Sequence, residues 1–117
     1  MASYSKLTLS GSVDGKPTAV AATATPGTLI HTGSTNVNIL HEIWLYAVNT
    51  HTAAIKLTVE WGDATTANNI EYTVAAENGL YLIAPGLLLK GNATALTVRA
   101  FAPTAGISIH GYINQIA

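Results

Sequence analysis

The sequence contains no cysteine in its 117 residues, which excludes disulfides, thiolate-bound metals and thiol chemistry. Charge is also scarce. Charged residues make up 9% of the chain, against about 25% in an average soluble protein. The five Lys and Arg residues are scattered and the net charge is -1, so the sequence offers no basic patch for nucleic acid.

Long apolar runs are absent as well. No stretch approaches the ~20 apolar residues of a membrane span, and the first residues lack the apolar run of a signal peptide. We therefore expect synthesis in the cytoplasm, no secretion by that route, and no membrane partner.

Neutral residues cover the surface in place of ions, mainly Thr, Ser, Asn and Ala. β-Branched threonine fits the pleated surface of a strand. Removing water from a hydroxyl also costs far less than removing it from an ion. This composition favours strands whose faces become buried against a partner protein.

A period of two dominates the chain and is clearest at 55–61, where apolar and polar residues alternate strictly. This pattern predicts a strand with one face in a core and the other in water. Polar-face carboxylates such as Glu60 and Glu71 are then expected to be solvated. Segment 42–48 is apolar on both faces, which predicts a central strand or one covered on its second side.

Turn residues interrupt the strands at short intervals, as at Asp14-Gly15, which favours a tight hairpin turn. Pro85-Gly86 is interpreted as another break. The predicted strands are 5–13, 18–24, 28–31, 39–48, 53–61, 69–75, 79–84, 87–90, 94–101 and 106–115. The sequence thus predicts an all-β protein, an antiparallel, jelly-roll-like β-sandwich of about eight to ten short strands.

The predicted organisation is residues 1–27 as an N-terminal hairpin or arm and residues 28–117 as the β-sandwich domain. Segment 18–25 has few side chains able to anchor it. It is either an edge hairpin or an arm that becomes ordered on a neighbouring subunit.

Catalytic groups do not form a recognisable pattern. His41, His51 and Asp63 could supply metal ligands if their loops converged, but their spacing does not place two ligands on one face. The serines lie outside any activating motif. We therefore expect no catalytic residues, no bound metal, no cofactor and no enzymatic activity.

Several apolar and aromatic residues are left without a place in a small core. Trp44 and Tyr46 either pack under another sheet or form the hot spot of an interface. His110 and Tyr112 alternate with core residues and should face outwards, while segment 81–90 is too continuously apolar to be buried entirely. The predicted subunit interface is Trp44, Tyr46, Leu87, Leu88, Leu89, His110 and Tyr112.

The chain from about Leu29 to Ile116 resembles the small virion proteins of tailed bacteriophages known as capsid decoration or cement proteins. The resemblance lies in HEIWLYAVN at 41–49, KLTVEWG at 56–62, PGLLL at 85–89, VRAF at 98–101 and GYIN at 111–114. It does not extend to the first 27 residues.

This resemblance implies a β-sandwich that trimerises and bridges subunits of the major capsid protein on the virion surface, after synthesis in the host bacterial cytoplasm. The alternative is a carbohydrate- or receptor-binding jelly-roll module of a phage tail or fibre, with Trp44, Tyr46 or Tyr112 as a stacking surface.

Overall fold

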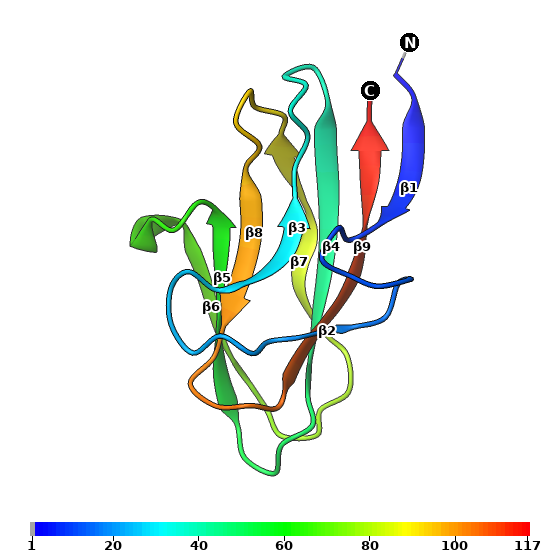
Figure 1. Cartoon of the computed structure of the whole chain (residues 1–117). Helices are drawn as coiled ribbons and strands as arrows, with labels where there is room; N and C mark the ends of the chain where they lie inside the picture. Colours follow the sequence, from blue (N-terminus) through cyan, green and yellow to red (C-terminus); the bar gives the residue numbers. More distant parts are fainter. Residues whose placement is uncertain (1) are drawn as a thin grey trace.

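The protein is an antiparallel β-sandwich, described by a computed structural model for residues 2–117 (Figure 1). Within these residues, sheet A has the order β1-β9-β4-β7, with β2 also paired to β9, and sheet B has the order β3-β8-β5-β6. The strands are β1 (Tyr4–Thr8), β2 (Thr18–Ala19), β3 (Thr28–Thr32), β4 (Leu40–Asn49), β5 (Ile55–Gly62), β6 (Asn69–Val74), β7 (Tyr81–Lys90), β8 (Thr97–Phe101) and β9 (Ile107–Ile116). A short 3₁₀ helix, η1 (Thr66–Asn68), precedes β6.

The pairing is nested along the chain. β1 pairs with β9, β3 with β8, β4 with β7, and β5 with β6, all antiparallel. Such nesting is what results when one long hairpin wraps into two facing sheets, which is the jelly-roll arrangement. The predicted fold class is therefore confirmed.

The core lies between the sheets and is built from the inward-facing residues that alternate along the strands. β4 shows the pattern clearly, because Ile43, Leu45 and Ala47 are buried whereas Trp44 and Tyr46 are only partly buried. β4 lies in the interior of sheet A, between β9 and β7, as its two apolar faces predicted.

Two tyrosines connect β6 and β7 at one side of the sandwich. Tyr72 and Tyr81 stack with ring centroids 4.3 Å apart and an interplanar angle of 7°. A stacked aromatic pair of this kind contributes about 0.5–1.5 kcal/mol beyond its buried area. It links the edge strands of the two sheets.

The N-terminal segment differs from the hairpin that the Asp14-Gly15 pair suggested. The tight turn is present, with φ of 55° at Asp14 and 79° at Gly15, and Lys16 N–H donates to Val13 O at 2.9 Å. Yet the flanking strands β1 and β2 both pair with β9, one after the other along its length. The segment that contains this turn therefore connects β1 and β2, which pair with β9 and not with each other.

The Pro85-Gly86 pair also differs from its prediction, because it does not end a strand. β7 continues through it, and the register against β4 shifts there, which is the geometry of a β-bulge. Gly86 has φ of 78°, and β7 is an edge strand, where proline's missing N–H is tolerated.

Candidate functional site: the outer face of sheet A

The outward side chains of β4 and β9 are partly exposed and form a continuous surface across the two paired strands. Cross-strand register places Trp44 beside Tyr112, Tyr46 beside His110, and Glu42 beside Asn114. We call this surface the aromatic face. It consists of Glu42, Trp44, Tyr46, His110, Tyr112 and Asn114, with Leu88 of β7 at its margin.

Two aromatic rings order the centre of this face. Trp44 and Tyr112 are stacked, with centroids 6.1 Å apart and an interplanar angle of 9°. The Lys6 ammonium, from β1, lies 5.3 Å from the centroid of the Tyr112 ring. The pair and the cation–π contact are together worth about 1–2.5 kcal/mol at an exposed site, which favours a fixed arrangement of the rings.

The carboxylate of Glu42 is held within the same face. Its Oε1 accepts hydrogen bonds from Trp44 Nε1 at 2.9 Å and from Asn114 Nδ2 at 2.8 Å. These two bonds, the Trp44 bond above all, lower the pKa of Glu42 below its ordinary value. The carboxylate therefore stays ionised and orients the indole ring.

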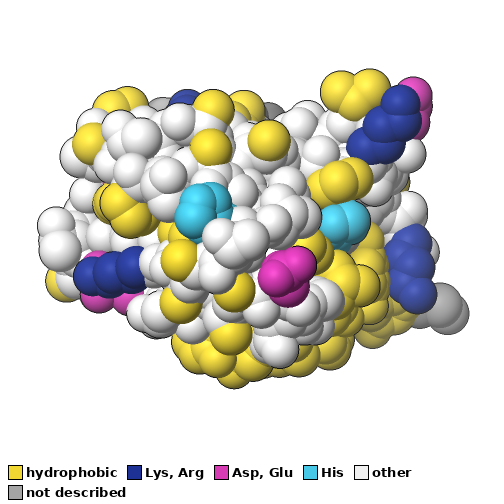
Figure 2. All heavy atoms as spheres, turned by 90° about the horizontal axis from the view of Figure 1, so that it is seen from below, with side chains coloured by type: hydrophobic (Ala, Val, Ile, Leu, Met, Phe, Trp, Pro, Cys, Tyr) yellow, Lys and Arg dark blue, Asp and Glu magenta, His cyan; other side chains and the backbone are white. Residues whose placement is uncertain are grey.

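Charged side chains are also sparse on another part of the surface. Figure 2, a view of one end of the molecule, shows mostly hydrophobic and uncharged atoms, with charged side chains in small separate groups. Hydrophobic atoms gather along the lower margin of that view.

Most of the predicted interface residues lie on one surface. Trp44, Tyr46, His110 and Tyr112 are on the aromatic face, and Leu88 extends it as a 54% exposed side chain. The sequence did not identify Glu42, Asn114 or Lys6 as members, because their relation to the rings depends on cross-strand register.

The other two predicted leucines, Leu87 and Leu89, do not lie on the aromatic face. Leu87 is 38% exposed, but it is the register partner of the core residue Ile43 and so lies at the side of the sandwich. Leu89 is 5% exposed and packs in the core. Its assignment to the interface was wrong, since continuous apolar sequence does not reveal which residues of a bulged strand turn inwards.

The prediction that Glu60 is solvated was also wrong. Glu60 points outwards from β5 but is only 2% exposed, because segment 25–27 lies over it. Its Oε2 accepts a hydrogen bond from the Thr25 hydroxyl, and its Oε1 accepts one from the Gly27 N–H at 2.6 Å. Glu71 does lie at the surface, where it pairs with Lys56 at 3.4 Å.

His41 belongs to a buried hydrogen-bond chain that the sequence did not suggest. Ser10 N–H donates to His31 Nδ1 at 3.0 Å, so His31 carries its proton on Nε2 and donates to His41 Nδ1 at 2.8 Å. His41 Nε2–H in turn donates to Gln115 Oε1 at 3.1 Å. These contacts define which ring nitrogens donate and which accept, and they connect the N-terminal segment to β3, β4 and β9.

The other two candidate metal ligands are engaged in local turns. His51 Nδ1 accepts from Ala53 N–H at 3.0 Å, and Asp63 accepts from Thr65 N–H at 2.9 Å. Within residues 2–117 the structure contains no group of three or more His, Cys, Asp or Glu residues placed to hold a metal ion.

The fold and this surface define a jelly-roll β-sandwich with an uncovered aromatic face. Comparison with models of protein families, with curated proteins and with solved structures finds no match. In the described part of the chain, no helix has the length and apolar character needed to cross a membrane.

Proposed function

We propose that this chain is a non-enzymatic structural protein of a bacteriophage virion, which attaches to neighbouring protein subunits through the aromatic face. It decorates the capsid surface as a homotrimer and stabilises the shell by bridging subunits of the major capsid protein. The observation that carries the proposal is the uncovered aromatic surface on β4, an interior strand of sheet A.

The chemistry of the face suits a protein partner. Trp and Tyr are the residues most enriched in interface hot spots, where they fill desolvated pockets. Trp44 is oriented before binding by its stack on Tyr112 and its bond to Glu42. A partner therefore does not have to order it, which lowers the entropic cost of association.

The two charged groups on the face add little to the desolvation cost of binding a partner. Glu42 already accepts two hydrogen bonds from its neighbours, and the Lys6 ammonium lies near an aromatic ring. Desolvating a charge whose hydrogen bonds are already made costs less than desolvating a free ion. The resemblance to capsid decoration proteins supplies the identity of the partner.

Replacing Leu88 with lysine tests this attachment directly. Leu88 lies opposite Glu42 on β4, so the new ammonium has a carboxylate beside it and the isolated fold is retained. Burying a leucine at an interface is worth about 1.5–3 kcal/mol. We therefore expect roughly 10- to 100-fold weaker binding to capsids assembled from the phage's major capsid protein, measured by co-sedimentation.

The matched control is Val13→Lys, which changes a 68% exposed aliphatic residue in the 13–16 turn. This variant should bind capsids like the unmodified chain. Equal binding by the Leu88 and Val13 variants, or no binding by the unmodified chain, would count against the proposal.

A further inference from the structure

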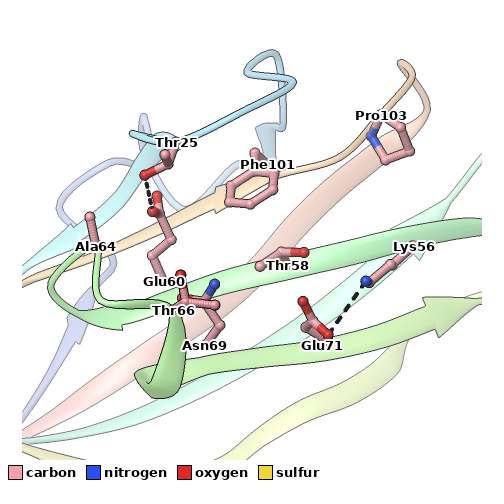
Figure 3. Close-up of a pocket in the computed structure, with 10 residues that line it drawn as sticks. All are labelled: Thr25, Lys56, Thr58, Glu60, Ala64, Thr66, Asn69, Glu71, Phe101 and Pro103. Atoms are coloured by element: carbon pink, nitrogen blue, oxygen red, sulfur yellow. Dashed lines mark hydrogen bonds and ion pairs between the residues drawn. The ribbon is translucent and has the colours of Figure 1, made fainter.

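The outer face of sheet B is covered by loops, unlike that of sheet A. Thr58 and Glu60 point outwards from β5, yet they are only 4% and 2% exposed. The loops around them leave a cavity of about 340 Å³, shown in Figure 3. It is lined by Thr25, Lys56, Thr58, Glu60, Ala64, Thr66, Asn69, Glu71, Phe101 and Pro103.

One end of this pocket presents fixed hydrogen-bond acceptors. The Glu60 carboxylate is oriented by the Thr25 hydroxyl and the Gly27 N–H, and each of its oxygens keeps a second lone pair. Asn69 is the register partner of Glu60 on β6. Its Oδ1 is buried and has no hydrogen-bond partner within the described residues.

A buried acceptor without a partner destabilises the folded protein by about 1–3 kcal/mol. A hydrogen bond from a ligand would remove this loss. A ligand donor next to Asn69 would therefore fill an acceptor that has no partner within the described residues, and Glu60 supplies further acceptors in the same pocket. In Figure 3 these two side chains lie together at the left end of the pocket, near Thr25 and Thr66.

The other end of the pocket holds an ion pair, and an aromatic ring lies between the two ends. Lys56 and Glu71 form an ion pair at 3.4 Å, both side chains being about half exposed, and they occupy the right end in Figure 3. Phe101, the register partner of Thr58, contributes an aromatic ring between the two ends. The pocket thus combines acceptors, ammonium and hydroxyl donors, and one apolar ring.

This combination selects a ligand class. Two carboxylates against one ammonium disfavour an anion. The Lys56–Glu71 ion pair leaves Glu60 as the remaining charge, and its carboxylate is already stabilised by the Thr25 hydroxyl and the Gly27 N–H, so the site does not need a cation. Buried polar groups disfavour a purely apolar ligand. A neutral ligand carrying many hydroxyls can donate to Glu60 and Asn69, accept from Lys56 and the threonines, and pack its C–H face on Phe101.

We infer that the loop-covered pocket of sheet B is a binding site for a neutral sugar of one or two rings. The volume is near the lower limit of about 300 Å³ for ligand pockets, which fits a small ligand. The pocket and the aromatic face lie on opposite sheets, so a chain attached through sheet A keeps the pocket accessible. The inference does not depend on the proposed function.

The test is a titration of ¹⁵N-labelled protein, followed by ¹H–¹⁵N NMR, with a panel of neutral hexoses, deoxyhexoses, N-acetylhexosamines and their disaccharides at millimolar concentration. We expect saturable shifts at the amides of Thr58, Glu60, Thr66 and Asn69 with at least one member. Asn69→Ala should weaken that binding at least about tenfold, the equivalent of one hydrogen bond to a buried group.

Asn69→Ala removes an acceptor that has no partner, so the variant is expected to fold. Phe101→Ala should weaken binding as well. The matched controls on the opposite sheet, Asn114→Ala and Trp44→Ala, should leave it unchanged. Absence of saturable shifts with every sugar would overturn the inference, as would binding that is lost in Trp44→Ala and retained in Asn69→Ala.

Discussion

Replacing Gly111 with alanine is expected to lower the free energy of unfolding by roughly 2–6 kcal/mol, the sum of about 1–3 for overpacking and about 1–3 for backbone strain. Gly111 lies on β9 opposite Leu45 of β4. A Cβ there would lie 2.0 Å from the Trp44 backbone oxygen. Gly111 also has φ of +156°, a conformation that residues with a Cβ rarely adopt.

The neighbouring atom belongs to the backbone of β4, so it cannot move away without disturbing the β4–β9 ladder. Urea unfolding followed by tryptophan fluorescence measures the effect. Gly79→Ala is the matched control, because Gly79 has φ of +68° but no atom within 4 Å of the added Cβ. It should lose only about 1–2 kcal/mol, the strain of a left-handed residue. Equal losses in the two variants would contradict the close approach of β9 to β4.

Acidification from pH 6.5 to pH 4 is expected to destabilise the protein by about 3 kcal/mol through His31. Burial, with the neighbouring His41, lowers the pKa of His31 from 6.5 to about 4. One pKa unit corresponds to about 1.4 kcal/mol. The unfolded chain takes up a proton as the pH falls below 6.5 whereas the folded chain does not, so stability is complete above pH 6.5 and declines towards pH 4.

Geometry gives the same direction, because a proton added to Nδ1 of His31 places two N–H donors against each other at the 3.0 Å contact with the Ser10 N–H. The measurement is the free energy of unfolding by urea at a series of pH values. His31→Gln, which does not titrate, should show a flatter profile between pH 6.5 and 4. His51→Gln, an exposed control, should keep the slope of the unmodified protein. Identical slopes in all three proteins would refute the role of His31.

Sequence periodicity was sufficient to predict β4, β5 and β9 and the faces to which their side chains point. The alternation at 55–61 corresponds to β5, with Leu57 and Val59 buried, and His110 faces outwards beside Tyr46. These results follow because a strand turns successive side chains to opposite faces, whatever it pairs with. The same rule predicted that Trp44 and Tyr46 share a face.

Strand alternation could not predict the contacts between segments that are distant in the sequence. Glu60 has the alternation of a solvated residue, but segment 25–27 covers it. His31 and His41 belong to different sheets, and their contact depends on how the sheets pack. Alternation specifies a face but not the register, the facing strand or the loop that covers it. The bulge in β7 had the same effect on Leu89, which continuous apolar sequence placed at the surface.

The association of the aromatic face with other subunits is the central claim, and sedimentation velocity of the purified chain over a range of concentrations tests it most directly. We predict a stable species of three times the 12.1 kDa mass of one chain, and its dissociation when Leu88 is replaced with lysine. A monomer that persists at the highest concentration, with the Trp44 indole accessible to solvent quenchers, would contradict the account.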